Sequence, residues 1–270
     1  MLKTLKHDFI STGRIMGVIY AIMVGVGLFT YVTKDVSEGQ LSFIGVLILM
    51  LMSICLLILT TVVVLMDFQK SLYGDRGYLT FTLPVKSWKI LASKVITSGT
   101  WFVVALAAII GSFAVAIYTA KEYLGDEAEM LSETIEMLLG KNVNSMIAMV
   151  IARILLLFIE FCFFALVIFF TNTVSNTRYF QKHSMLFTIV LFIPIFIITY
   201  KISGLVNENL VFSVFFLDGK PEFVMDNAVY SQYIYQYSHI DLSEIFVYLI
   251  FGTGLFFGTH YLMSKKVNIR

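Results

Sequence analysis

Two ionisable side chains, Arg153 and Glu160, lie inside one long run of apolar residues and are the first candidates for chemistry. A charged side chain at mid-bilayer costs about 2.5–3.5 kcal/mol on insertion scales, so such residues usually face protein or water. On a helix the two share one stripe at about 10 Å along the axis, too far apart for a simple ion pair. The stripe predicts a translocation path or a subunit interface. The alternative is a structural polar contact between helices, with Arg153 snorkelling outward.

A second candidate is the stretch 67–94, which lies between two apolar runs but is itself rich in aromatic residues. Aromatic side chains outside a bilayer need a surface to bury against. Gly74 and Gly77 bracket a turn, Pro84 stops a helix and Ser87 can cap the next one. The pattern predicts a short helix, a turn and a second helix that dock on a cytoplasmic partner, or that pack on the protein's own helix ends. The residues expected to make the contact are Phe68, Leu72, Tyr73, Gly74, Asp75, Arg76, Gly77 and Tyr78.

Several catalytic patterns are missing from the sequence. It has no GxxxxGK[ST] phosphate loop, no HExxH and no GxSxG. The four His are scattered, and the two Cys lie in apolar runs, which predicts packing roles for them. The chain itself is therefore predicted not to be an enzyme and to hold no cofactor or metal, and no nucleic-acid partner is expected.

The elements that must position these residues are long apolar helices. The 270-residue chain is 59% hydrophobic and only 14% charged, whereas soluble domains are nearer a quarter charged. A spanning helix needs about 20 apolar residues, so we predict an all-α polytopic membrane protein with one transmembrane domain, 1–270. Pro194 lies within the fifth run and predicts a kink, either a hinge or static packing. The six spans are expected at 15–33, 41–66, 98–120, 145–171, 184–202 and 243–263.

Charge is distributed unequally between the gaps that separate these runs. Thirteen of the nineteen Lys and Arg fall in alternate gaps together with three acids, while the remaining gaps hold five basic and fourteen acidic residues. Short basic loops stay in the cytoplasm. Both termini and the loop 67–94 are therefore predicted to be cytoplasmic, and 121–144 and 203–242 to be external. The acidic external side could attract cationic molecules, or it could reflect topology alone.

The remaining gaps predict smaller elements. Residues 2–14 fit a short amphipathic helix on the membrane surface, or a solvated tail. Residues 126–140 predict an external amphipathic helix. Residues 209–217 predict a strand or a re-entrant segment, and Asp218-Gly219 a turn. The tyrosines that follow fit an interfacial belt or an exit gate; they are Tyr230, Tyr233, Tyr235 and Tyr237.

The loop 67–94 also resembles a known family. The stretch Lys70-Ser-Leu-Tyr-Gly-Asp-Arg-Gly-Tyr-Leu-Thr-Phe-Thr-Leu-Pro84, with Leu91 to Lys94 after it, is similar to the intracellular loop of ABC transporter permeases of the type-two export class. The likeness is greatest to stand-alone permeases of Gram-positive bacteria. It implies a coupling helix near Asp67 to Tyr78 that inserts into a separate ATPase subunit, which binds ATP and Mg. It also implies an N-terminal connecting helix and a dimer of permeases. The external helix departs from the class, in which that loop is usually short.

The function expected from the resemblance is that of the membrane subunit of an ATP-driven exporter in a bacterial cell (plasma) membrane. Amphipathic or antimicrobial peptides are the leading expectation for the cargo, with lipids or drugs as alternatives. The second permease protomer could be identical or related. Two other classes stay open: a non-transporting peptide sensor or immunity protein, and an ATP-independent carrier or channel.

Overall fold

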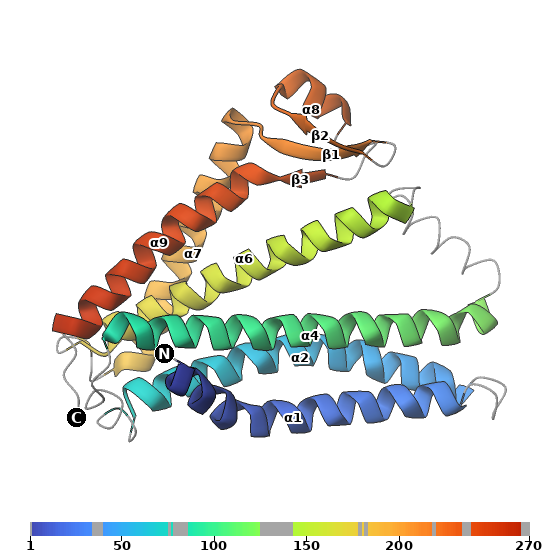
Figure 1. Ribbon diagram of the computed structural model, residues 1–270, viewed down its shortest axis with the longest axis horizontal. Helices are drawn as coiled ribbons and strands as arrows, with labels where there is room; N and C mark the ends of the chain where they lie inside the picture. The colour runs from blue at the N-terminus through green and yellow to red at the C-terminus, as the bar shows by residue number, and fades with distance from the viewer. Residues whose placement is uncertain are drawn as a thin grey trace. The chain divides into compact units, whose positions relative to one another are not determined.

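Six long apolar helices make up most of the described chain (Figure 1). Each contains a stretch that is long and apolar enough to cross a membrane, which confirms the predicted all-α polytopic membrane fold. The helices are α1 (Leu2–Val32), α2 (Gln40–Leu72), α4 (Ser87–Leu124), α6 (Val143–Ser175), α7 (Ser184–Asn209) and α9 (Leu242–Lys265). The computed structural model describes residues 2–33, 40–74, 77, 86–124, 143–177, 180, 183–217, 220–233 and 239–265.

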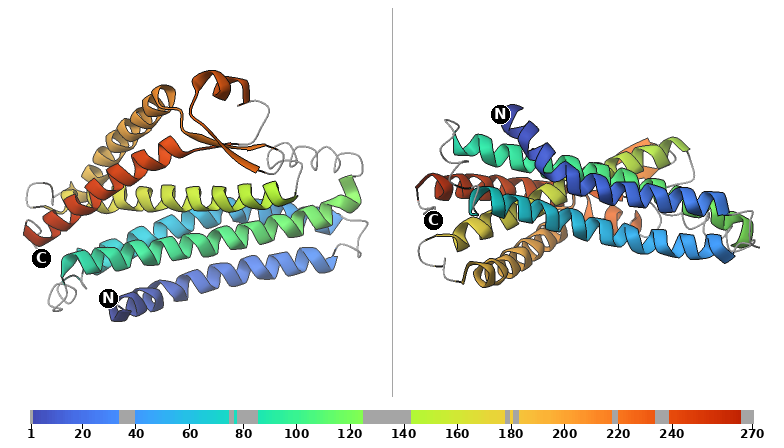
Figure 2. Two further views of the ribbon diagram at one scale, coloured as in Figure 1. Left: turned by 45° about the horizontal axis from the view of Figure 1, so that its top comes forward. Right: turned by 90° about the horizontal axis from the view of Figure 1, so that it is seen from below.

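The chain divides into two compact units, Met1–Leu131 and Ser132–Arg270. In the first unit, α1, α2 and α4 pack against one another. They lie side by side and run in alternating directions (Figure 2). A buried apolar cluster lies among the three helices and takes one residue from each: Met23, Leu56 and Ala105.

Helix α1 is continuous from Leu2 to Val32, so residues 2–14 form its first turns rather than a separate amphipathic helix. In this segment Ile10 is exposed, whereas Asp8 and Thr12 are buried. Asp8 and Thr12 lie one turn apart on the same face, and their hydrogen-bond partners come from α4. The polar face of this segment is thus the one that packs on the protein.

In the second unit, α6 packs against both α7 and α9. The rings of Phe163 in α6 and Tyr248 in α9 stack at 5.1 Å. Phe164 in α6 contacts Phe192 of α7 edge-on at 5.4 Å. Pro194 lies inside α7, and the helix continues through it to Asn209.

A three-stranded antiparallel sheet joins the end of α7 to the start of α9. Its strands are β1 (Ser213–Leu217), β2 (Lys220–Val224) and β3 (His239–Asp241), in the order β2-β1-β3. The strand predicted within 209–217 is thus confirmed, in place of the re-entrant alternative. Leu217 pairs with Lys220, which leaves a two-residue connection where the sequence predicts the Asp218-Gly219 turn; these two residues lie outside the described part.

Different helices cover the two faces of the sheet. Phe215 is fully buried on one face, where α8 (Asn227–Tyr233) supplies Tyr230 at 5.7 Å and Tyr233 at 5.9 Å between ring centroids. On the other face Ile240 packs with Met149 and Leu156 of α6. Figure 1 shows the sheet between α8 and the ends of α6 and α9. Tyr230 and Tyr233 therefore pack on the sheet. The predicted external helix 126–140, Tyr235 and Tyr237 lie outside the described residues.

The burial of Phe215 makes it the main apolar anchor between the sheet and α8. We expect Phe215→Ala to lower the free energy of unfolding by about 3–5 kcal/mol, because it leaves a cavity beneath α8. Phe223→Ala is the matched control, since the Phe223 ring on the neighbouring strand is exposed. Thermal unfolding in detergent micelles measures both. Equal losses for the two variants would contradict Phe215 as the anchor.

Candidate functional site

Lys94 lies buried where α1, α2 and α4 meet, and its ammonium contacts two carboxylates. Lys94 Nζ is 2.7 Å from Asp8 Oδ1 and 2.5 Å from Asp67 Oδ2. Asp8 belongs to α1, Asp67 to α2 and Lys94 to α4, so a single side chain joins all three helices. We call these three residues the Lys94 hub.

Each carboxylate oxygen of the Lys94 hub has a hydrogen-bond partner. Ser93 Oγ donates to Asp8 Oδ2 at 3.0 Å, and Ser11 Oγ donates to Asp67 Oδ1 at 2.9 Å. Buried charges are costly unless they are both paired and hydrogen-bonded. A fully satisfied network of this kind favours a single geometry, so the hub holds the three helices in one arrangement.

A further chain of hydrogen bonds extends from the hub along α1 and α4. Trp101 Nε1 donates to Thr12 Oγ1 at 2.8 Å, and the Thr12 hydroxyl donates to the Asp8 carbonyl at 2.8 Å. Tyr20 OH donates to the Trp101 carbonyl at 3.1 Å, and the two rings stack at 6.0 Å. The link between α1 and α4 therefore continues past the hub, toward the cluster around Met23 that Tyr20 also contacts.

The hub spans both ends of the candidate docking loop. Asp67 is the first residue of the stretch 67–94 and Lys94 is the last. The resemblance implied a separate coupling helix that begins near Asp67. Because α2 extends through Leu72, Asp67 instead lies inside a long helix. Each of the three hub residues lies just beyond a predicted apolar run. The hub therefore sits at the side of the first unit where the loop emerges.

Gly74 and Gly77, the glycines predicted to bracket a turn, are joined by a backbone hydrogen bond, and the two residues between them lie outside the described part. The Tyr73 and Gly74 amides both donate to the Gln69 carbonyl, at 2.9 and 3.0 Å, and end α2. The Gly77 amide then donates to the Gly74 carbonyl at 2.8 Å. A Cβ on Gly77 would overlap the Leu72 carbonyl oxygen, which is a backbone atom and cannot simply rotate away. The chain therefore requires Gly at this position.

The residues expected to contact a partner have different surroundings in the structure. Phe68 and Leu72 are fully buried, which for these two side chains favours the alternative that the segment packs on the protein itself. Tyr73 is half-buried with its ring 6.0 Å from Phe68. Gly74 is exposed and Gly77 is buried. Asp75, Arg76 and Tyr78 lie outside the described residues.

The two ionisable residues of α6 also differ from each other. Arg153 Nη2 donates to the His239 carbonyl of β3 at 2.9 Å, so it makes a structural polar contact with a strand and not the contact between helices that was the alternative to a translocation role. Glu160 is half-buried, and its charged neighbours are Glu244 of α9 and Arg153. No hydrogen bond or ion pair of the described residues joins Glu160 to either of them, so its predicted role in a translocation path or an interface stays a prediction. Pro194 lies in α7, and no hydrogen bond or ring contact of the described residues joins it to either side chain.

A second polar network holds the sheet to the helices of its unit. Ser213 Oγ of β1 donates to Asp241 Oδ1 at 2.6 Å, and Asn207 Nδ2 of α7 donates to Asp241 Oδ2 at 3.3 Å. Ser243 Oγ of α9 donates to Asn207 Oδ1 at 2.6 Å. Burial and the neighbouring Asp241 carboxylate raise the pKa of Tyr230 to about 12.

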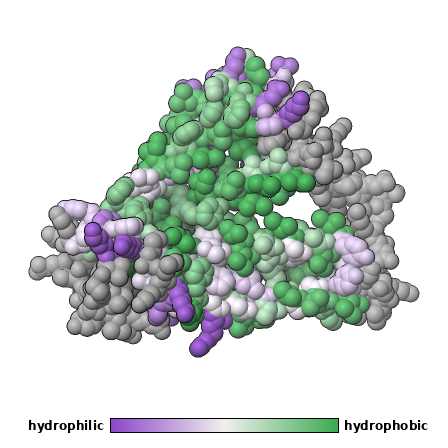
Figure 3. All heavy atoms as spheres, viewed as in Figure 1, coloured by the Kyte–Doolittle hydropathy of each residue, from purple (hydrophilic) through white to green (hydrophobic). Residues whose placement is uncertain are grey.

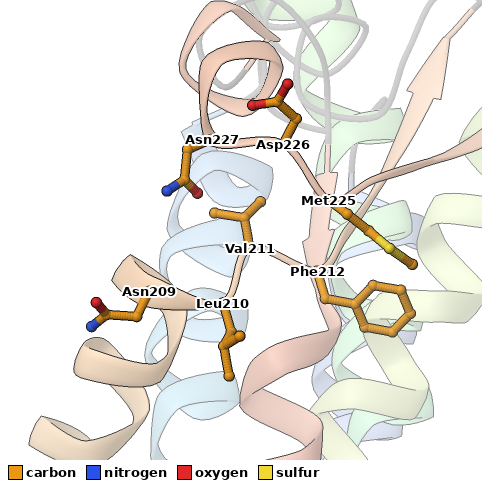
Figure 4. A pocket seen from close by; sticks show the side chains of 7 residues that line it. All are labelled: Asn209, Leu210, Val211, Phe212, Met225, Asp226 and Asn227. Carbon is orange, nitrogen blue, oxygen red and sulfur yellow. The ribbon is translucent and has the colours of Figure 1, made fainter.

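An open hollow of about 690 Å³ lies beside this network, where α7 ends and the sheet begins. Asn209 and Asn227 lie on one side of it, and Phe212 and Met225 on the other (Figure 4). The full lining is Asn209, Leu210, Val211, Phe212, Met225, Asp226 and Asn227. Within the described part of the chain, no three His, Cys, Asp or Glu side chains gather as a metal site.

Comparisons of the chain with protein-family models, with curated proteins and with solved structures found no match in any of the three. The resemblance of the 67–94 loop to exporter permeases therefore stays a prediction.

The sequence contained one usable signal for the Lys94 hub. Only three acids fall in the gaps predicted to be basic and cytoplasmic, and they are Asp8, Asp67 and Asp75. Two of these three are hub residues. An acid on an otherwise basic side is a reasonable candidate for a buried ion pair, but nothing local identifies Lys94 among thirteen basic residues as its partner.

Removing the ammonium of the hub should be costly. Lys94→Met leaves the buried Asp8 and the partly buried Asp67 without a cation and is expected to lower the free energy of unfolding by about 3–5 kcal/mol. Lys86→Met is the control, because Lys86 is exposed and its loss should have little effect. A triple variant that adds Asp8→Asn and Asp67→Asn should recover part of the loss. Thermal unfolding in micelles gives the midpoint of each of the three variants. Equal midpoints for Lys94→Met and Lys86→Met would show that the hub does not stabilise the fold.

The contact of Gly77 with the backbone of Leu72 gives a separate expectation. Gly77→Ala should destabilise the end of α2 by about 1–3 kcal/mol, as overpacking does. Gly111→Ala is the control, because a Cβ there meets nothing within 4 Å and Ala is the better helix former. Limited proteolysis of the loop and thermal unfolding measure the difference. Equal tolerance of the two substitutions would show that the turn adjusts freely.

Proposed function

We propose that this chain is the membrane-spanning subunit of an ATP-driven ABC exporter in a bacterial cell membrane, and that a separate ATPase subunit and a second permease protomer complete the transporter. Six apolar helices supply the membrane body. The Lys70 to Pro84 stretch resembles the loop through which such permeases contact their ATPase.

The observation that carries the proposal is the position of the Lys94 hub at both ends of the loop. A force on the loop reaches α2 through Asp67 and α4 through Lys94, and the same ion pairs connect it to α1 through Asp8. Separating these helices would expose or unpair buried charges, which costs several kcal/mol. The three helices therefore move together when the loop moves. An energy-coupled transporter needs such rigid transmission between two states.

The expected cargo follows from the charge of the predicted external side. Fourteen acids fall in the gaps assigned to that side, and among the described ones Glu208, Glu222 and Asp226 are exposed. A negative surface attracts cationic molecules over distances near the Debye length, about 8 Å at physiological salt. Amphipathic or antimicrobial peptides that carry positive charge match this field, and they are the cargo that we propose first.

Co-purification from native membranes tests the partnership. We expect an ABC ATPase to co-purify with the chain. The double variant Tyr73→Ala and Asp75→Ala should still fold but should lose most of the co-purifying ATPase. Tyr200→Ala in α7 is the control, because that exposed Tyr is far along the sequence from the loop. An ATPase retained at full yield by the double variant would contradict the docking assignment. Absence of any ATPase from the wild-type preparation would favour a peptide sensor, an immunity protein or a carrier.

The orientation of the loop is a condition of the proposal. Trp88→Cys in a background with Cys55→Ala and Cys162→Ala places one thiol beside the loop, at an exposed position of α4. We expect a membrane-impermeant maleimide to label it only after the cells are opened. Ser231→Cys, exposed on α8, should label from outside and serves as the matched control. Labelling of position 88 in intact cells would place the loop on the wrong side for an ATPase.

A further inference from the structure

An apolar surface extends from the sheet of the second unit onto α9. Phe223 of β2 is 64% exposed and Met225 is 69% exposed, although both are large apolar residues. Phe212 lies between Phe223 and Phe246 of α9, with ring centroids 6.2 and 6.1 Å away. Phe246 is itself 55% exposed. We call Phe212, Phe223, Met225 and Phe246 the aromatic edge.

The direction of Phe223 follows from the pairing of the strands. Val214 of β1 pairs with Phe223 of β2 and with Ile240 of β3, so these side chains share one face of the sheet. On that face Ile240 and Val214 pack with α6. Because β2 is the edge strand on the other side of β1, Phe223 extends beyond the part of the sheet that α6 covers. It projects on the same side as the helices, while α8 covers the opposite face.

The aromatic edge continues the lipid-facing side of α9. Three exposed apolar residues, Leu249, Ile250 and Phe257, lie three, four and eleven residues after Phe246, which places them on one stripe of the helix. On a membrane-spanning helix an exposed apolar stripe faces acyl chains. In Figure 3 apolar side chains cover α9, and hydrophilic ones gather at the tip around α8. Phe246 therefore stands at the end of the lipid-facing stripe, and Phe212 and Phe223 extend it past the end of the helix.

We propose that the aromatic edge inserts into the bilayer, at the boundary between headgroups and acyl chains, so that the sheet lies on the membrane surface and does not project into water. Segments that lie in this zone bury an apolar face by about 5–10 Å and keep their polar face in water. The sheet has this polarity. Glu222 faces the α8 side, opposite Phe223, because it pairs with Phe215.

A second protein chain fits the aromatic edge less well than lipid. An edge strand can pair with another chain through its free backbone groups. The strand β2 is only five residues long, however, and Pro221 within it has no amide hydrogen to donate. Strand addition at this edge is therefore disfavoured, whereas insertion into lipid requires no backbone partner. The inference rests on the second unit alone and holds whether or not the chain works with an ATPase.

Single probes on the sheet test this placement. Single cysteines are introduced in the background with Cys55→Ala and Cys162→Ala, and each is labelled with an environment-sensitive fluorophore. The four variants are Phe223→Cys, Met225→Cys, Glu222→Cys and Ser231→Cys. The chain is reconstituted in vesicles of phosphatidylethanolamine and phosphatidylglycerol. We expect probes at 223 and 225 to emit at shorter wavelength than probes at 222 and 231. Lipid that carries a nitroxide near its headgroup should quench the probes at 223 and 225, and iodide in the water should not. At 222 and 231 we expect the reverse, quenching by iodide and none by the nitroxide lipid.

Two results would overturn the proposal. Iodide quenching at 223 and 225 as strong as at 231 would mean that the edge is in water. Protection from both quenchers that is lost when the vesicles are diluted in protein would mean that a second copy covers the edge. The probe at 222 is the control, because it lies one residue from 223 on the opposite face of β2. Strong iodide quenching at 222 in a preparation shows that the two faces of the strand differ as the fold requires.

Discussion

The arrangement of the first three helices depends on one buried lysine. In a bilayer, apolar side chains gain little by leaving lipid for protein, so helix association depends on close packing and on polar contacts. The ammonium of Lys94 meets Asp8 and Asp67, and serines satisfy the remaining carboxylate oxygens. Any other relative rotation of α1, α2 and α4 would separate these charges. The apolar cluster around Leu56 then fills the space that the hub defines.

The second unit uses the same principle at its own helix ends. Asp241 joins α7 to β1, Ser243 extends the network into α9, and Arg153 bonds the backbone of β3 from α6. In both units carboxylate networks lie near the ends of long apolar helices, and in the first unit Ser53 of α2 also meets Ser112 of α4 further along the helices.

The two proposals assign the connections to opposite sides of the membrane. The loop beside the Lys94 hub can transmit force, since both of its ends are tied to all three helices of its unit. The sheet beyond α7 and α9 has one face covered by α8 and an aromatic edge that continues the lipid-facing stripe of α9. A sheet supported by lipid keeps its position relative to the bilayer while the helices beneath it shift.

Local features of the sequence predicted the six apolar helices and the strand before Asp218, because length, composition and residue type act over a few neighbouring residues. The direction in which polar side chains face required the folded chain. Asp8, Asp67 and Lys94 are charged residues near helix ends, and their sequence is the same whether they meet water or one another. Phe68 and Leu72 resemble contact residues until the packing shows them to be buried. Each of these outcomes depends on helices that are distant in sequence and meet only when the unit is assembled.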